Sequence, residues 1–395
     1  MRTFSSRNKM SRLAIITTHP IQYYAPVFKA LAGQHKQTKV FYTSGEGSIK
    51  KFDPDFQKTI EWDIPLLDGY DYTFLKNTAS NPGTTHFRGI INPDAITAID
   101  KFDPAVVLVY GWAWHSHLKI IRHYAKTKKI WFRGDSTLLD ATKGYRKVIR
   151  YILLKWIYRH VNLAFYVGAQ NRAYFQHFGL KESQLKFAPH SIDNNRYSAD
   201  RSEEAASIRQ QLQVPLSGIL VLFAGKLEQK KDPFALLEAF EYVTNGDVFL
   251  LFAGNGELEK ELKLRAGHSV KKDKIFFLGF QNQSVMPALY QACQIFCLPS
   301  VGPGETWGLA VNEAMAAGRA VIVSDKVGCA VDLVKEGVNG AIFKSGDRRD
   351  LSIKLQNLSE STDLLEKAGE ASKRIIENWS VDKQVSFILR ELNTI

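Results

Sequence analysis

The sequence predicts an α/β protein made of two doubly wound, Rossmann-like domains that face a cleft. Short apolar runs alternate with amphipathic segments along most of the chain, which predicts parallel sheets covered by helices on both faces. A polar stretch at 196–216 separates two such series and is the expected linker. The length of 395 residues is sufficient for two domains of ordinary size. We therefore expect one domain over 1–200, a second over 201–375 and a terminal helix over 376–395.

The N-terminal series starts after a basic segment. Apolar runs of four to six residues predict strands, and longer amphipathic segments predict helices. Residues 44–95 are rich in Gly, Asp, Pro and aromatic residues, and this predicts an insertion or a lid. The expected strands are 13–17, 38–42, 106–110, 129–132 and 163–167, and the expected helices are 26–32, 114–127, 143–160 and 171–178.

The C-terminal series repeats the alternation. A helix that starts near Gly308 should stop at Gly318, because glycine commonly ends helices. The expected strands are 219–224, 248–253, 275–278, 293–299 and 321–323, and the other expected helices are 232–243, 257–266, 285–291 and 382–395.

Composition and charge narrow the class of protein. No apolar run approaches the ~20 residues of a membrane-spanning helix, and the three cysteines, Cys293, Cys297 and Cys329, indicate reduced thiols of a cytoplasmic protein. Residues 1–200 hold 29 Lys and Arg against 15 Asp and Glu, whereas the rest holds 23 against 25. The basic half suits an anionic partner: membrane lipid, a phosphorylated acceptor or nucleic acid.

Glu305 and Glu313 form the most informative pair in the chain. They follow a predicted strand and a Gly-rich loop, at the carboxyl end of a parallel sheet, where open α/β folds bind ligands. Eight helical residues rise about 12 Å, whereas two carboxylates that act on one glycosidic bond lie about 5 to 10 Å apart. The spacing therefore favours gripping two ends of an extended ligand. Free N–H groups at the helix start between them suit a phosphate.

A second motif, Gly225-Lys226-Leu227-Glu228-Gln229-Lys230-Lys231, also follows a strand and opens a helix. Gly225 allows close backbone approach, and Lys226 and Lys231 suit a diphosphate leaving group. The alternative is a purely structural role, in which Asp232 is the N-cap of a helix and Pro233 its first residue. This alternative is compatible with a diphosphate site.

In this order the motifs resemble the nucleotide-sugar domain of the retaining glycosyltransferases of family 4, which have the GT-B fold. The resemblance is strong over about 215–345. It rests on the lysine motif, Ala253-Gly254-Asn255-Gly256, Phe277-Leu278-Gly279, Leu298-Pro299-Ser300 and above all the segment Glu305 to Glu313.

The resemblance implies a role for each matched residue. Glu305 contacts hydroxyls of the donor sugar, and Glu313 binds the ribose. Lys226 and Lys231 contact the diphosphate, although the family usually has Arg at the first of these positions. The sugar and diphosphate face the backbone of Thr306, Trp307, Gly308 and Leu309, and the base lies by Phe280 and Gln281.

The N-terminal half matches the family less well. Where many relatives have a Gly-Gly loop, this chain has His19, Pro20 and Gln22. His19 is either a cleft residue or part of a structural turn, with Tyr23 and Tyr24 shaping the acceptor side. After later strands, His115 competes with His117 for a cleft-facing position. Arg133 binds phosphate or acceptor, or pairs with Asp135.

The segment 143–160 combines basic and aromatic residues, which suits an anionic membrane surface. The alternative is a basic helix that simply packs on the sheet. Asp53-Pro54-Asp55 resembles a metal-binding motif, but a GT-B enzyme does not require it, and we expect neither a metal nor another cofactor.

The resulting hypothesis is a cytoplasmic, retaining and metal-independent glycosyltransferase, which would be peripheral on the inner face of the membrane if 143–160 contacts lipid. It would use a UDP- or GDP-linked sugar, bound by the second domain, and a glycan or lipid-linked acceptor, bound by the first, and we expect it to bind no nucleic acid. The family precedent is front-face displacement, with the final helix crossing back to the first domain. The alternatives are a nucleotide-sugar epimerase on the same fold and a basic membrane- or nucleic-acid-binding protein with an inactive cleft.

Overall fold

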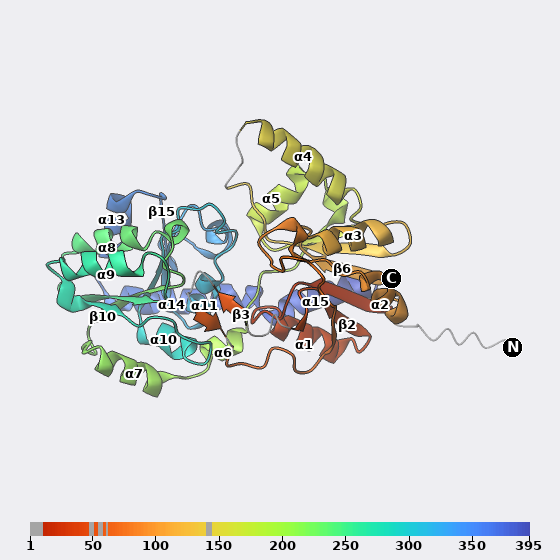
Figure 1. Ribbon diagram of the computed structural model, residues 1–395. Coiled ribbons are helices and arrows are strands. Elements are labelled where there is room, and N and C mark those ends of the chain that lie inside the picture. Colours follow the sequence, from red (N-terminus) through yellow and green to blue (C-terminus); the bar gives the residue numbers. More distant parts are fainter. Residues whose placement is uncertain (1–10, 47–50, 54–57, 61, 140–143) are drawn as a thin grey trace.

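The computed structural model describes residues 11–46, 51–53, 58–60, 62–139 and 144–395, which form two α/β halves lying side by side (Figure 1). Each half has one fully parallel main sheet, with strand order β5-β2-β1-β6-β7-β8-β9 in the N-terminal half and β12-β11-β10-β13-β14-β15 in the C-terminal half. The predicted fold class is confirmed.

The N-terminal sheet is covered on both faces because its strands bury both sets of alternating side chains. Leu13 and Ile15 of β1 point into one apolar cluster, and Ala14 and Ile16 point into another. Its strands are β1 (Leu13–Thr17), β2 (Thr38–Tyr42), β5 (Asp71–Phe74), β6 (Val106–Tyr110), β7 (Lys129–Arg133), β8 (Leu163–Tyr166) and β9 (Leu185–Phe187). Its helices are α1 (Ala25–Gln34), α2 (Ala95–Phe102), α3 (His115–Tyr124), α4 (Tyr145–Tyr158) and α5 (Ala169–His177), with short 3-10 turns η2 (Phe87–Gly89) and η3 (Glu182–Gln184).

The C-terminal sheet follows the same rule. Leu220 and Leu222 of β10 join one apolar cluster, and Val221 and Phe223 join the other. Its strands are β10 (Ile219–Ala224), β11 (Val248–Ala253), β12 (Ile275–Phe277), β13 (Ile295–Leu298), β14 (Ala320–Ser324) and β15 (Gly340–Phe343). The helices of this half are α7 (Ser202–Gln211), α8 (Pro233–Glu241), α9 (Glu259–Gly267), α10 (Met286–Ala292), α11 (Leu309–Ala316), α12 (Ala330–Leu333), α13 (Arg348–Leu358) and α14 (Thr362–Ile376), and the 3-10 turns are η4 (Gln229–Lys231), η5 (Lys272–Lys274) and η6 (Glu377–Trp379).

Two segments differ from the expectation. The loop-rich region 44–95 contains an antiparallel hairpin, β3 (Lys51–Asp53) and β4 (Lys58–Ile60), and also β5, the edge strand of the N-terminal sheet. The polar stretch 196–216 is mostly helical, with the end of α6 (Asn194–Ser198) followed by α7. In α7 the buried Arg209 donates to the carbonyls of Ala292 and Gly218 and so ties this stretch to the C-terminal sheet.

The last helix, α15 (Val381–Leu392), packs against α1, and its Val385 and Ile388 belong to an apolar cluster of the N-terminal sheet. All three cysteines are free and buried. Among the helices of the described residues, none combines the length and the apolarity needed to cross a bilayer.

Candidate active site

A cleft of about 480 Å³ opens between the two halves, at the carboxyl ends of β10, β11 and β13. This is the edge of a parallel sheet at which open α/β folds bind ligands. From the N-terminal half, the cleft is lined by residues that include Gln22, Tyr23 and Asp135. The predicted site residues that line it are Gly225, Lys226, Lys231, Phe280, Gln281, Glu305, Thr306, Trp307, Gly308, Leu309 and Glu313.

The N-terminus of α11 faces this cleft because of one glycine. Gly308 precedes the helix with φ +95, a left-handed conformation that other residues rarely adopt, and a Cβ there would lie 2.8 Å from Val327 Cγ1. The first N–H groups of an α-helix lack partners within the helix, and the N-terminus carries partial positive charge. Gly308 and Leu309 both line the cleft, so this end of α11 is placed to meet an anion.

Lys231 and Glu305 form a buried ion pair in the cleft. Lys231 Nζ lies 2.6 Å from Glu305 Oε2, and their side chains are 16% and 10% exposed. Ser300 Oγ donates to the same oxygen at 3.0 Å. The pair holds both side chains in one orientation, and an ammonium group with three N–H donors can still contact a further anion.

The loop after β10 lies very close to the loop after β11. A Cβ on Gly254 would lie only 1.9 Å from the carbonyl oxygen of Gly225, so glycine is required there. Beyond the loop, the Asp232 side chain accepts a hydrogen bond of 3.2 Å from Ala235 N, with Pro233 opening α8, as expected for an N-cap. This cap fixes the turn η4 that carries Lys231.

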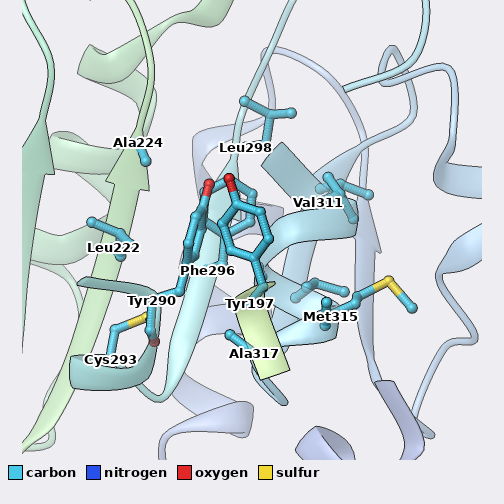
Figure 2. Close-up of a cluster of buried hydrophobic side chains, with 14 of the residues drawn as sticks. Tyr197, Leu222, Ala224, Tyr290, Cys293, Phe296, Leu298, Val311, Met315 and Ala317 are labelled. Atoms are coloured by element: carbon cyan, nitrogen blue, oxygen red, sulfur yellow. The ribbon is translucent and has the colours of Figure 1, made fainter. Parts of the chain in front are cut away.

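Glu313 is buried beneath the cleft and accepts hydrogen bonds from three tyrosine hydroxyls. Tyr197 donates at 2.6 Å and Tyr23 at 3.0 Å to Oε1, and Tyr290 donates at 2.7 Å to Oε2. Figure 2 shows the hydroxyl groups of Tyr197 and Tyr290 at the same end of the apolar cluster. Burial raises the pKa of Glu313, and the tyrosine hydrogen bonds oppose that shift. Three of about four acceptor positions of this carboxylate are therefore already used.

The other end of the cleft is closed by contacts between the two halves. The rings of Trp62 and Phe280 lie 6.4 Å apart. Beside them, Asp63 Oδ1 accepts a hydrogen bond of 3.1 Å from Ser284 N. Gln281 is held by a hydrogen bond from its Nε2 to Leu278 O at 2.6 Å. The start of the segment that links β4 to β5 thus covers the predicted base-binding end.

Asp135 connects the N-terminal half to the start of α11. Its Oδ2 accepts a hydrogen bond of 2.8 Å from Thr306 Oγ1 and lies 3.9 Å from His190 Nε2. Burial lowers the pKa of His190 to about 4, although Asp135 opposes the shift. His190 was not predicted as a site residue. Its proline neighbour and its position after β9 are the only local signals for it.

Three predicted residues are not among the described residues that line the cleft. Nδ1 of His19 lies 3.0 Å from Oγ1 of its neighbour Thr18. His115 begins α3 and packs its ring 6.0 Å from that of Phe87. The buried Arg133 donates to Ala188 O at 2.8 Å and to Pro189 O at 2.9 Å, so its guanidinium stabilises a chain turn.

His117, the competitor of His115, also has a structural environment. It is fully buried, with Nδ1 3.0 Å from Gly111 O and Nε2 2.9 Å from Thr43 Oγ1. Burial lowers its pKa to about 4, so the ring is neutral and Nδ1 carries the proton that Gly111 O accepts. Both histidines follow β6, but neither is among the described residues that line the cleft.

For a metal ion, the described residues offer no group of three or more His, Cys, Asp or Glu side chains placed to bind one. Within the motif Asp53-Pro54-Asp55, residues 54 and 55 lie outside the described residues.

Part of the chain is similar in sequence to known glycosyltransferases. Residues 204–375 match the family model described as glycosyl transferases group 1. An uncharacterized glycosyltransferase of Methanocaldococcus jannaschii is 30% identical over 165 residues, which cover 41% of this chain and 42% of that protein. A phosphatidyl-myo-inositol mannosyltransferase of Mycobacterium leprae is 30% identical over 184 residues, 46% of this chain and 48% of that protein. The chain thus spans about half the length of the curated relatives it matches.

Among solved structures, Anabaena HepE in complex with UDP is similar over 97% of this chain and all of that one, with a TM-score of 0.75 and 17% identity. The same protein has been solved with UDP-glucose, at a TM-score of 0.72 and 16% identity. At these identities the likeness establishes the shared two-domain fold. The match to the glycosyl transferases group 1 covers residues 204–375, whereas the likeness in fold covers nearly the whole chain.

Proposed function

We propose that the protein is a retaining, metal-independent glycosyltransferase that moves a sugar from a nucleotide diphosphate sugar to a glycan or glycolipid acceptor, in cell-surface polysaccharide synthesis. The observation that carries the proposal is the gathering of Lys226, Lys231, Glu305 and Glu313 around the start of α11 in one cleft between the halves. Each group has a counterpart on a nucleotide sugar.

The diphosphate fits the centre of the cleft. Lys226 and Lys231 supply positive charge there, and the N-terminus of α11 supplies N–H groups and the positive end of the helix dipole. These groups would stabilise the charge that develops on the leaving diphosphate. The ion pair with Glu305 keeps Lys231 in position before the donor binds.

The sugar fits beside Glu305. Its Oε2 already accepts from Lys231 and Ser300, so Oε1 is the oxygen that would accept from a sugar hydroxyl. The ribose would lie toward Glu313 and the base toward Phe280 and Trp62. The UDP and UDP-glucose complexes of HepE support a uridine nucleotide in this position.

In the reaction, the bond from the anomeric carbon to the diphosphate oxygen breaks and a bond to the acceptor oxygen forms on the same face. The proton of the acceptor hydroxyl passes to the departing phosphate, so no protein nucleophile is required. Asp135 is placed on the acceptor side, where its hydrogen bond to Thr306 aligns the N-terminal half with the start of α11.

The test is a donor screen in buffer with EDTA. We expect UDP, more than GDP or ADP, to raise the melting temperature of the full chain, because a ligand stabilises the state to which it binds. We also expect the anomeric configuration of the donor to be kept in the product, as read by NMR. Epimerised donor in the absence of any acceptor would replace the proposal by the epimerase alternative, and loss of transfer in EDTA would overturn metal independence.

A further inference from the structure

A second cavity, of about 440 Å³, lies in the N-terminal half under α4. Six aromatic side chains line it, among them Trp112, Trp114 and Tyr174. Its volume is in the range of about 300 to 1,000 Å³ that small-molecule sites occupy, and mostly apolar walls with few polar groups are typical of such sites. The donor functions described above use none of these aromatic residues.

One polar residue joins this cavity to the cleft. Asp135 lines both spaces, and its side chain remains 42% exposed although it accepts from Thr306. A molecule in the aromatic cavity could therefore place a hydroxyl next to Asp135 and reach the donor sugar. This continuity is the geometry that an acceptor site requires.

At another part of its wall the cavity has a cation. Arg150, an exposed residue of α4, lines the cavity and donates to the Tyr174 hydroxyl at 3.4 Å. A guanidinium beside aromatic walls suits a ligand that has an anionic group next to an apolar or ring-shaped part.

The outer face of α4 is apolar and open to solvent. Five large apolar residues are 40% to 72% exposed, at the spacing of one helix face: Tyr145, Val148, Ile149, Ile152 and Leu153. Contiguous exposed apolar residues on a monomer mark an interaction surface. In Figure 1, α4 projects from the N-terminal half, beyond the helices that cover the sheet.

The charge around this face identifies the partner. Helix α4 itself contains four cationic side chains, Arg146, Lys147, Arg150 and Lys155, and no Asp or Glu. An apolar helix face flanked by cations is typical of helices that lie in the interface of an anionic bilayer. Nucleic acid would use the cations but would leave Val148, Ile149 and Ile152 in water.

We propose that the aromatic cavity is the acceptor site and that α4 docks the protein on an anionic membrane that supplies the acceptor. The acceptor is a lipid with an anionic group, such as a phosphate, near its sugar or hydroxyl-bearing head. The head occupies the cavity between Arg150 and Asp135, and the lipid chain stays in the bilayer against α4. The assignment as acceptor rests on the proposed transferase function, whereas membrane docking and amphiphile binding can be measured without it.

The first experiment is flotation of the full chain with vesicles of phosphatidylcholine alone or with a quarter of phosphatidylglycerol. We expect binding to the anionic vesicles only, and at least a tenfold loss in Ile149→Glu/Ile152→Glu. The matched control is Ile353→Glu on α13, since Ile353 is 48% exposed in the other half. Absence of binding to anionic vesicles, or an equal loss of binding in the control, would overturn the docking surface. It would also be overturned if the protein bound RNA and the double variant bound RNA equally well.

The second experiment addresses the cavity with dodecyl phosphate below its critical micelle concentration, measured by calorimetry against inorganic phosphate and dodecyl glucoside. We expect dodecyl phosphate to bind best and Arg150→Gln to weaken it at least tenfold. Arg146→Gln, one turn away on α4 and outside the cavity lining, should leave binding unchanged. Equal binding of inorganic phosphate, or an Arg150→Gln variant that binds as well as wild type, would overturn the assignment.

The UDP-induced rise in melting temperature is measured in the same variants. If UDP stabilises all of them, the donor site is intact in every variant. Any change in vesicle or dodecyl phosphate binding is then due to α4 or to the aromatic cavity alone. If UDP stabilises none of the proteins, wild type included, the proposed transferase function fails separately, and with it the assignment of the cavity to an acceptor.

Discussion

The Tyr23 hydroxyl donates a hydrogen bond of 3.0 Å to Glu313 Oε1 across 290 residues of sequence and from one half of the molecule to the other. Tyr197 and Tyr290, which share this carboxylate, donate at 2.6 and 2.7 Å and belong to α6 and α10 beside it. Tyr23 has the longest of the three hydrogen bonds and is the only one of these donors from the N-terminal sheet domain. It is therefore the donor that a ribose hydroxyl could displace most readily.

We predict that Tyr23→Phe tightens UDP binding by about twofold to tenfold, the range of one net hydrogen bond. The variant frees an acceptor position on Glu313 for the ribose, and titration calorimetry measures the change in Kd. Tyr72→Phe, at a 37% exposed tyrosine of β5, is the control. Weaker UDP binding in Tyr23→Phe would mean that the tyrosine orients Glu313 for the ribose instead of competing with it.

The Lys231–Glu305 pair gives the second prediction. Lys231→Ala should lower kcat at least a hundredfold, because it removes charge that stabilises the leaving diphosphate. Glu305→Gln should lower kcat/KM by a similar order, because it weakens the contact to the sugar. Both are measured as UDP release from the donor with acceptor present.

The control for these variants is Lys367→Ala, which breaks the exposed pair of Lys367 with Asp363 at 2.7 Å on α14. Exposed pairs of this kind contribute little to stability. Turnover at the wild-type level in both Lys231→Ala and Glu305→Gln, with melting temperatures unchanged, would remove these residues from the active site.

Asp135 and Thr306 should act as a unit. We predict that Asp135→Asn and Thr306→Val each raise the KM for acceptor more than the KM for donor, since their hydrogen bond aligns the acceptor side with α11. In a double-mutant cycle the two effects should fall short of additivity by about 1 kcal/mol. Fully additive effects would show that the two residues contribute independently.

The fourth prediction concerns pH. Burial lowers the pKa of His117 from 6.5 to about 4, so the folded protein holds this ring neutral while the unfolded chain protonates it below pH 6.5. The stability that His117 contributes is therefore present above pH 6.5 and is lost as pH falls toward 4. We expect the free energy of unfolding to drop by about 2 kcal/mol between pH 7 and pH 5 through this group.

Urea denaturation at both pH values measures that loss. His117→Gln should reduce the pH dependence, whereas the exposed His268→Gln should leave it as in wild type. The same pH dependence in wild type and His117→Gln would contradict the assignment of this loss to His117.

The buried strands could be read from the sequence because each carries its own signal. The predicted bounds of β1, β2, β6, β10 and β11 coincide with those of the structure. Apart from β2, which begins with Thr38 and Lys39, each consists almost entirely of apolar residues, as expected for strands buried on both faces of a parallel sheet. The elements that were missed carry weaker patterns. β5 is an edge strand with half its residues exposed, and α7 has a polar surface with Ala205 and Arg209 buried.

The C-terminal part of the site could also be predicted, because its residues follow local motifs. Lys226, Lys231, Glu305 and Glu313 each follow a strand, and the carboxyl ends of neighbouring parallel strands meet at one edge of the sheet. The sequence by itself therefore determined the two-sheet fold and one side of the cleft.

Only the tertiary structure decided how the N-terminal half completes that cleft. It places Tyr23 and Asp135 opposite Glu313 and Thr306, and it turns Arg133 into the chain interior. Local patterns encode which residues form a strand end, but they do not encode the orientation of one domain against another. That orientation comes from packing between residues more than a hundred positions apart, such as Tyr23 with Glu313 and Asp135 with Thr306.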